Sequence, residues 1–294
     1  MANLKAIRLR IASVKSTRQI TSAMKMVAAA KLRKAQDKIV RLRPYANKLH
    51  EILLDLSQSL AEAEVENIYS RTATPDKILI VIITSNRGLC GAFNANIIKE
   101  ARRIVNENYY EQYRQDNVRF LAIGKKGFDY LRKKNYPLAA EYNDLLNNLT
   151  FDNVAAVAEK VMEGFVSGEF DRVELIYNHF KNAAIQQLRT ELFLPVESVT
   201  DSEETSAPSD YIYEPGSEAI MKELIPKSLK IQFYKAILDS YVAENGARMT
   251  AMHKATDNAT TMISELTLQY NKARQAAITN QILEVVSGAE ALKA

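Results

Sequence analysis

Apolar residues recur at alternating steps of three and four along the first 60 positions of the chain. Fourteen of the seventeen positions in this frame are apolar, where about eight would be expected from a hydrophobic content of 47%. A sustained seven-residue repeat predicts a long coiled-coil helix. The frame consists of Leu4, Ile7, Ile11, Val14, Arg18, Thr21, Lys25, Ala28, Leu32, Ala35, Ile39, Leu42, Ala46, Leu49, Leu53, Leu56 and Leu60.

Polar residues interrupt this frame in its middle, and a second apolar stripe lies beside them. We therefore expect the helix to turn a different face to its neighbour there. A proline further along, Pro44, is expected to kink the helix because proline removes a backbone hydrogen bond. The interruptions are Arg18, Thr21 and Lys25, and the second stripe is Ile20, Met24 and Val27.

The C-terminal part of the chain repeats the pattern, with ten of twelve positions of one frame apolar. The frame slips from Ile278 onward. Pro226 suits a first helical turn, so we expect a helix from 226 to the low 290s, paired antiparallel with the N-terminal helix. The frame consists of Leu238, Val242, Asn245, Met249, Met252, Thr256, Ala259, Ile263, Leu266, Tyr270, Ala273 and Ala277.

The two frames face each other only when paired residue numbers sum to 263, 270 or 277. We expect 270, because this register sets Lys25 against Asn245 and brings the two prolines level. Thr21 would then lie beside Met249. About 24 residues at the C-terminus, roughly 36 Å of helix, would extend beyond the N-terminal helix.

The middle of the chain alternates between strand and helix patterns. We expect strands at 77–84, 118–124, 171–180 and 185–195, and helices at 95–113, 127–135 and 151–166. Such alternation predicts a Rossmann-like, mainly parallel sheet with helices on its faces. The fold class is therefore α/β, with a long antiparallel coiled coil and a Rossmann-like domain. The expected divisions are 1–60, 76–200, an acidic linker segment at 201–225, and 226–294.

Composition excludes several classes of protein. The 294 residues contain no run of about 18 apolar residues and no apolar signal core at the N-terminus, so we expect a cytoplasmic chain without a membrane span. One cysteine, Cys90, excludes an intrachain disulfide. The three histidines are far apart in sequence, so we expect no metal site.

Charge is distributed unevenly. Residues 1–60 carry 13 Lys/Arg against 3 Asp/Glu, whereas residues 61–225 carry 18 against 26. The basic N-terminal segment must therefore meet a negative partner, which could be nucleic acid, anionic lipid or an acidic protein surface. In this segment the basic residues are interleaved with the apolar frame, unlike the basic regions of DNA-binding zippers.

Two turns follow predicted strands, where α/β folds bind ligands. SNRGLCGAFN (85–94) has only Gly88 and Gly91, and IGKKGFDY (123–130) offers Lys125 and Lys126 without phosphate-loop spacing. We interpret both as turns or protein contacts, and we expect no bound cofactor. Cys90 has no histidine nearby in sequence to activate it as a nucleophile. The alternatives that remain are a nucleic-acid-binding coiled coil and a nucleotide-dependent enzyme.

Four sequence motifs are specific enough to indicate a protein family. They are IASVKSTRQITSAMKMVAAAKLRKAQ, TSNRGLCGAFN, DYIYEP at 210–215, and ENGARMTAMHKATDNATTMISELTLQYNKARQAAITNQILEVVSGAEAL. In this order they closely resemble the gamma subunit of F-type ATP synthases. The resemblance implies a non-catalytic rotor that turns inside a hexamer of alpha and beta subunits. Its α/β foot would stand on the membrane c ring beside epsilon, at the cytoplasmic face of a bacterial inner membrane, and would bind no nucleic acid.

The resemblance also implies which residues meet partners. Met24 and Arg248 would lie near an acidic loop of the beta subunit, with Cys90 close by. Higher on the shaft, the residues that touch a beta loop would be Arg274, Gln275 and Thr279. Tyr211 and Tyr213 would be foot residues that face the c ring and epsilon.

Overall fold

The computed structural model describes residues 4–60, 68–70, 75–182, 185–196 and 217–291. The chain forms two compact units. Residues 1–29 and 248–294 make up one, here called the helical unit, and residues 30–247 make up the other, the α/β unit. Two long helices, α1 (Leu4–Leu60) and α6 (Ser217–Ala291), contribute to both units.

The α/β unit is built on a five-stranded sheet with the order β3-β2-β1-β4-β5. Strands β1 to β4 are parallel and β5 is antiparallel to β4. This arrangement confirms the Rossmann-like prediction. The strand bounds are β1 Ile78–Ile83, β2 Val118–Ile123, β3 Leu138–Tyr142, β4 Arg172–Phe180 and β5 Gln186–Leu194.

Strand β3 was not expected from the sequence. Its five residues, LAAEY, alternate between partly buried and exposed positions, as in a strand at the edge of a sheet. Two alanines and a glutamate give it weak β-propensity. The expected helix at 95–113 is also divided, into α2 (Phe93–Asn108) and the short α3 (Tyr110–Arg114).

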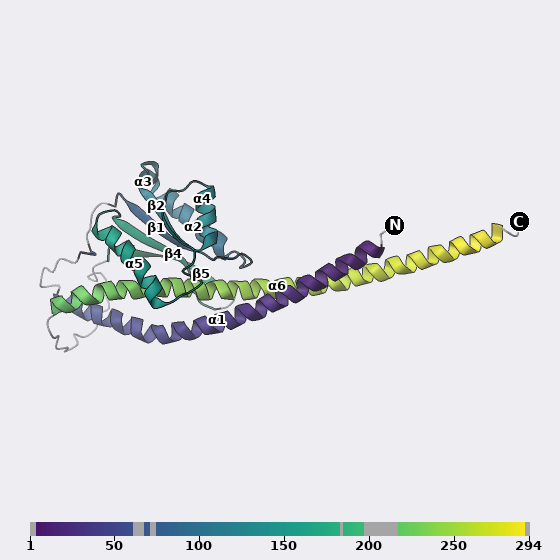
Figure 1. Ribbon diagram of the computed structural model, residues 1–294, viewed down its shortest axis with the longest axis horizontal. Helices are drawn as coiled ribbons and strands as arrows, with labels where there is room; N and C mark the ends of the chain where they lie inside the picture. The colour runs from purple at the N-terminus through teal and green to yellow at the C-terminus, as the bar shows by residue number, and fades with distance from the viewer. Residues whose placement is uncertain (1–3, 61–67, 71–74, 183–184, 197–216, 292–294) are drawn as a thin grey trace. The chain divides into compact units, whose positions relative to one another are not determined.

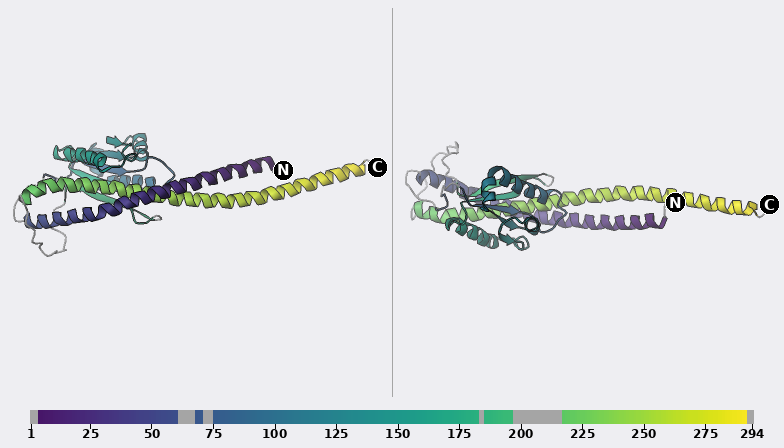
Figure 2. Two further views of the ribbon diagram at one scale, coloured as in Figure 1. Left: turned by 60° about the horizontal axis from the view of Figure 1, so that its bottom comes forward. Right: turned by 90° about the horizontal axis from the view of Figure 1, so that it is seen from above.

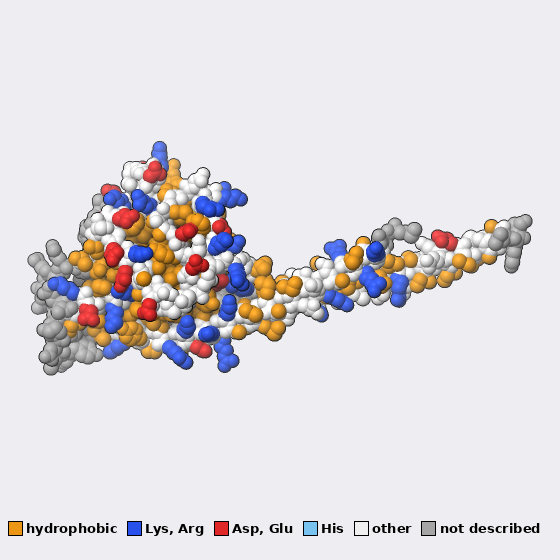
Figure 3. Space-filling view, in the orientation of Figure 1, with side chains coloured by type: hydrophobic (Ala, Val, Ile, Leu, Met, Phe, Trp, Pro, Cys, Tyr) orange, Lys and Arg blue, Asp and Glu red, His pale blue; other side chains and the backbone are white. Residues whose placement is uncertain are grey.

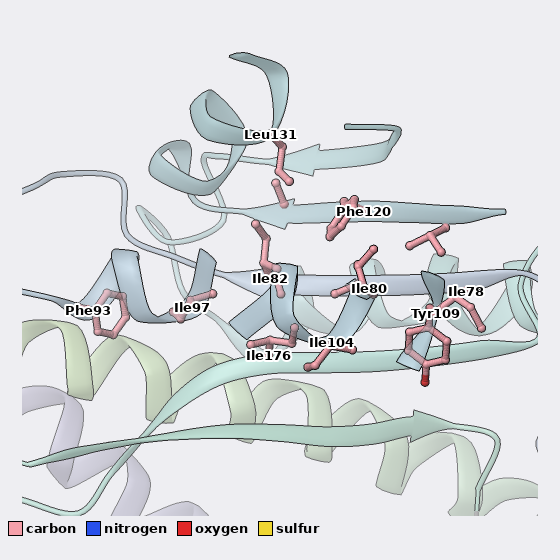
Figure 4. Close-up of a cluster of buried hydrophobic side chains, with 14 of the residues drawn as sticks. Ile78, Ile80, Ile82, Phe93, Ile97, Ile104, Tyr109, Phe120, Leu131 and Ile176 are labelled. Atoms are coloured by element: carbon pink, nitrogen blue, oxygen red, sulfur yellow. The ribbon is translucent and has the colours of Figure 1, made fainter. Parts of the chain in front are cut away.

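Helices α2 and α4 (Lys125–Lys133) cover one face of the sheet (Figure 1). The even-numbered residues of β1 point toward these helices, since side chains of a strand alternate between its two faces. Ile78, Ile80 and Ile82 are fully buried there, together with Ile97 of α2 and Leu131 of α4 (Figure 4). All six positions of β1 are buried, as expected for the central strand of a sheet covered on both faces.

The first part of α6 contacts β1, β4 and β5. The Phe233 ring lies 5.3 Å from that of Phe193, and Ser240 Oγ donates to the Ile83 carbonyl at 3.3 Å. His179 Nδ1 is 2.8 Å from the buried Asp239 carboxylate. These contacts join a helix near the C-terminal end of the chain to strand residues 40 or more positions earlier.

Helix α5 (Phe151–Val166) lies beside α6 in the same unit. The Thr150 hydroxyl caps its first turn by accepting from the Asn153 amide at 3.4 Å. The Phe151 ring meets Tyr234 edge-on at 5.6 Å between centroids, and Lys230 of α6 pairs with Glu159. Helix α5 is thus fixed to α6 by an aromatic contact and an ion pair.

Helix α6 begins at Ser217, nine residues before the expected start. Pro226 is therefore an interior residue and not the first turn. A single proline removes one hydrogen bond, that to the carbonyl of Lys222 four residues earlier, and the helix continues. Helix α1 likewise continues through Pro44.

The buried residues of the helical unit belong to the expected heptad frames, whose other members are mostly partly buried. Views from three directions show the N-terminal part of α1 beside α6 (Figures 1 and 2). The buried residues are Thr21, Ala28, Met252, Ala259 and Leu266, all of which belong to the two predicted frames.

The predicted register and the predicted change of face are both wrong. Thr21 Oγ1 is 2.9 Å from Thr256 Oγ1, so paired residue numbers sum to 277 and not 270. Ile20 and Val27 are exposed while Thr21 is buried. The physical reason is the hydrogen bond between the two hydroxyls, which allows polar residues to stay between the helices.

Two assumptions caused the error in register. The first assumption was that Pro226 begins α6 level with Pro44, but α6 begins at Ser217. Lys25 was expected to face Asn245, but its Nζ lies 3.5 Å from His253 Nδ1. Asn245 instead donates to the Tyr241 carbonyl of its own helix at 2.8 Å. A shift of one heptad preserves the apolar contacts, so the hydrophobic pattern could not distinguish the two registers.

Candidate partner-contact surfaces

The turn at residues 84–94, here called the glycine turn, joins β1 to α2 and is held by internal hydrogen bonds. Asn94 Oδ1 accepts from the Ser85 amide at 2.9 Å, and Asn94 Nδ2 donates to Ser85 Oγ at 2.8 Å. Asn94 Nδ2 also lies 3.3 Å from Cys90 Sγ. Short polar side chains that bond to nearby backbone stabilise such turns. The turn therefore has a fixed conformation.

Cys90 does not present its thiol at the surface. The residue is 1% exposed and belongs to the hydrophobic core cluster beneath α2. The exposed residues of the turn are Arg87, Leu89, Gly91 and Ala92. The expected contact at Cys90 therefore remains a prediction about the turn rather than about the sulfur atom.

The first amides of α4 are occupied by the protein itself. The Lys125 amide donates to Asn86 Oδ1 at 3.0 Å, the Lys126 amide to the Ser85 carbonyl at 3.0 Å, and the Gly127 amide to Thr84 Oγ1 at 2.9 Å. In nucleotide-binding α/β folds, amides at this position hold phosphate. Here a phosphate would have to displace three internal hydrogen bonds.

Gly124 serves this close packing. Its φ is +98°, and a Cβ at this position would lie 2.2 Å from the Thr84 carbonyl oxygen. The glycine thus lets β2 turn into α4 directly against the end of β1. Among the residues that the structure describes, no group of three or more His, Cys, Asp or Glu side chains could hold a metal ion.

The helical unit contains Met24 and Arg248, and both side chains are partly buried. Exposed apolar residues flank Met24 on α1, at Ile20 and Val27. Residues 1–29 carry six Lys/Arg and no Asp/Glu. Basic side chains are visible on the paired helices in Figure 3. This surface therefore combines apolar side chains with positive charge.

The end of α6 is unpaired. With the register of 277, Leu4 at the start of α1 is level with Ala273, and every residue from 278 to 291 is exposed. Arg274, Gln275 and Thr279 are all exposed, and the Thr279 hydroxyl donates to the Gln275 carbonyl at 3.0 Å. Tyr211 and Tyr213, the expected foot contacts, lie outside the described residues.

A hollow of about 290 Å³ in the α/β unit is lined by three lysines of α1, namely Lys31, Lys34 and Lys38. Leu238 and Tyr241 of α6 and the 146–150 loop complete its lining. Lys38 Nζ donates to the Leu149 carbonyl at 3.4 Å. No acidic residue lines this hollow. The α/β unit therefore has a basic hollow of its own.

Comparison with known proteins shows the general family of the chain. The model of the ATP synthase family matches residues 3–292, almost the whole chain. Within the described residues, no helix has the length and hydropathy needed to cross a membrane. The chain thus belongs to the ATP synthase family.

Sequence identity to individual relatives shows which subunit of the ATP synthase this chain corresponds to. The chain is 57% identical over 292 residues to the ATP synthase gamma chain of Flavobacterium johnsoniae, covering 99% of each chain. It is 51% identical over 294 residues to that of Cytophaga hutchinsonii, again covering 99% of each. The chain belongs to the ATP synthase gamma-chain family.

Solved structures agree with this assignment. A chain in the central stalk and c-ring structure of the Tetrahymena thermophila mitochondrial ATP synthase has 29% identity and a TM-score of 0.61, covering 80% of this chain and 99% of that chain. A chain of the Euglena gracilis mitochondrial ATP synthase rotor has 24% identity and a TM-score of 0.66, with 94% and 98% coverage. The second likeness concerns the fold alone.

Proposed function

We propose that this chain is the rotor of the central stalk of an F-type ATP synthase, transmitting torque between a membrane c ring and a catalytic alpha/beta hexamer. The observation that carries the proposal is the identity of 57% with a bacterial gamma chain along nearly the full length of both. The structural relatives, which belong to a central stalk with a c ring and to a rotor, support it. The coupling ion is a proton or sodium.

A rotor must transmit torque without binding any one orientation tightly. The paired helices of the helical unit support the first requirement, because buried residues and a hydrogen bond join them. The dispersed positive charge supports the second, since exposed ion pairs contribute only about 0–1 kcal/mol each. Many weak contacts with acidic surfaces of beta subunits let the rotor pass from one to the next.

The proposal assigns no chemistry to the chain itself. Three amides at the start of α4 are already hydrogen-bonded, which argues against a phosphate site at this end of the sheet. We expect calorimetric titration with Mg-ATP to give no signal. Micromolar binding that is lost in Gly88→Ala or Gly91→Ala would contradict a non-catalytic role.

The partner contacts follow from this role. Met24 and Arg248 would face an acidic loop of the beta subunit, and the glycine turn would bring Cys90 near it. The exposed Arg274, Gln275 and Thr279 would touch a second beta loop. Tyr211 and Tyr213 would meet the c ring and epsilon, at the cytoplasmic face of a bacterial inner membrane.

The test is assembly followed by ion pumping. The tagged chain should co-purify with alpha and beta subunits and epsilon, and vesicles that contain the whole complex should pump ions when given ATP. Met24→Lys adds a fixed charge to the apolar surface and should reduce pumping more than reversal of the exposed Lys31 does. Recovery of nucleic acid in place of the hexamer, with retention that falls steeply with salt, would exclude the rotor.

A further inference from the structure

Leu89 has an unusual backbone conformation for a leucine. Its φ is +63°, in the left-handed region. The other non-glycine residues with positive φ among those described are Asp116 and Asn135, two types that tolerate this region. A bulky residue does so only at an energetic cost, because its Cβ crowds the neighbouring carbonyl.

The interior of the chain gains little from this conformation. The Leu89 side chain is 63% exposed, so only a minor part of it packs against the protein. Single exposed apolar residues are common, but strained ones are not. The turn cannot relax, because hydrogen bonds among Ser85, Cys90 and Asn94 fix its base. Strain that the fold maintains without packing benefit suggests a use outside the chain.

Basic residues lie in the same turn as the exposed leucine and at the adjoining start of α4. Arg87 precedes it in the turn and is exposed, as are Lys125 and Lys126 at the start of α4. Lys126 Cε lies 4.0 Å from the position that a Cβ would occupy on Gly88. Residues 84–94 and 123–128 contain no Asp or Glu. The turn therefore presents an apolar side chain in a basic segment of the chain.

We propose that Leu89 is the anchor by which the glycine turn engages a beta subunit, inserting into an apolar socket bordered by carboxylates. This inference rests on the proposed function and specifies the contact made by the turn. Charge complementarity selects the partner, because an exposed apolar side chain in a turn that carries Arg87 and lies against Lys126 matches an acidic segment with an apolar centre. Cys90 then acts as a positioning residue, with its buried side chain holding the turn.

The first experiment separates contact from folding. Complexes reassembled with Leu89→Ala, Leu89→Gly and Leu89→Met are compared with wild type for ATP-driven ion pumping and for melting temperature of the isolated chain. We expect pumping to fall about fivefold in the alanine and glycine variants and to stay within about twofold in the methionine variant. Leu89→Gly should also raise the melting temperature by about 2 °C, because glycine relieves the strain.

In Leu89→Gly, pumping falls while the melting temperature rises only if the leucine acts on a partner. A structural role would instead lower the melting temperature together with pumping, and that result would overturn the proposal. Pumping within twofold of wild type in all three variants would overturn it as well.

The second experiment tests the charge of the socket. Leu89→Asp and Leu89→Lys remove the same apolar group but place opposite charges against it. We expect Leu89→Asp to pump at least threefold more slowly than Leu89→Lys, and the difference to shrink as salt concentration rises. Equal rates, or a slower lysine variant, would exclude an acidic partner. A wild-type complex that does not pump would contradict the proposed function itself, whereas a pumping wild type with insensitive variants contradicts only the anchor.

Discussion

The hydroxyl oxygens of Thr21 and Thr256 lie 2.9 Å apart across the two long helices, and Thr256 Oγ1 also lies 2.8 Å from the Met252 carbonyl oxygen of its own helix. Thr21 in turn donates to the Arg18 carbonyl of its own helix at 3.1 Å, so its oxygen is free to accept from Thr256. Thr21 is a buried residue. A polar pair of this kind specifies register, because any other alignment would leave a buried hydroxyl opposite an apolar group.

This register can be tested by crosslinking. The pair Thr21→Cys and Thr256→Cys should form a disulfide on mild oxidation, because the two positions face each other. The pair Thr21→Cys and Met249→Cys should not, since residue 249 is seven residues, about 10 Å of helix, from Thr256. Electrophoresis without reductant distinguishes the two. Preferential crosslinking of the second pair would restore the register of 270.

The same pair should show energetic coupling. Thr21→Val and Thr256→Val should each cost about 1 kcal/mol of unfolding free energy, since each leaves its partner hydroxyl without a bond across the helices. The double variant should cost less than the two single costs added together. Urea denaturation measures all three. Strict additivity would show that the hydrogen bond contributes nothing.

A proline should destabilise the chain when placed in the buried part of α6 but not when placed in its exposed end. Ala259 is buried in the helical unit, so Ala259→Pro should cost about 3 kcal/mol or more and uncouple ATP hydrolysis from pumping. Glu284→Pro, in the exposed segment 278–291, serves as the matched control and should leave the melting temperature nearly unchanged. Deletion of residues 288–294 should likewise spare pumping. Equal destabilisation by both prolines would contradict the unpaired end.

Gly124 should tolerate no side chain. Gly124→Ala places a Cβ 2.2 Å from the Thr84 carbonyl oxygen at a φ of +98°, so β2 and α4 must separate from β1. We expect a loss of about 2 kcal/mol or more. Gly88→Ala is the control, because its Cβ would meet only Lys126 Cε at 4.0 Å. Thermal unfolding of both variants gives the comparison.

The proton on the Tyr177 hydroxyl should make the free energy of unfolding depend on pH in the alkaline range. Burial raises the pKa of its hydroxyl above the ordinary value, and the hydrogen bond to Glu191 at 2.6 Å raises that pKa further. The folded chain therefore holds this proton more tightly than the unfolded chain. Its contribution to the free energy of unfolding is complete below about pH 10 and is lost as pH rises above that value.

Replacement of Tyr177 by phenylalanine should flatten this decline. Tyr177→Phe should cost about 1 kcal/mol at pH 8 and less at pH 11, measured by urea denaturation. The matched control is Tyr45→Phe, at an exposed tyrosine of α1, which should change neither value. A constant cost at both pH values would show that the proton on Tyr177 is not linked to folding.

The sequence predicted those features that depend on local periodicity. The frames containing Ala28 and Leu266 were visible because burial repeats every three or four residues. The mainly parallel direction of the strands followed from their alternation with helices, whereas the order of the strands was not predicted. The edge strand β3 was missed because its composition is not typical of strands.

The sequence could not predict features that depend on contacts between distant segments. The hydrogen bonds from the start of α4 to Thr84, Ser85 and Asn86 join residues about 40 positions apart. The strain at Leu89 depends on how Asn94 closes the turn. The pairing of Thr21 with Thr256 separated two registers that were equal in hydrophobic pattern.

The exposed end of α6 has a consequence for how the cell makes this chain. Ile282, Leu283, Val285 and Val286 are between 49% and 72% exposed within a few residues of one another. Such an apolar surface, while uncovered, favours self-association and recognition by chaperones and proteases. If the proposed hexamer covers this end, copies of the chain made in excess of it should be degraded first.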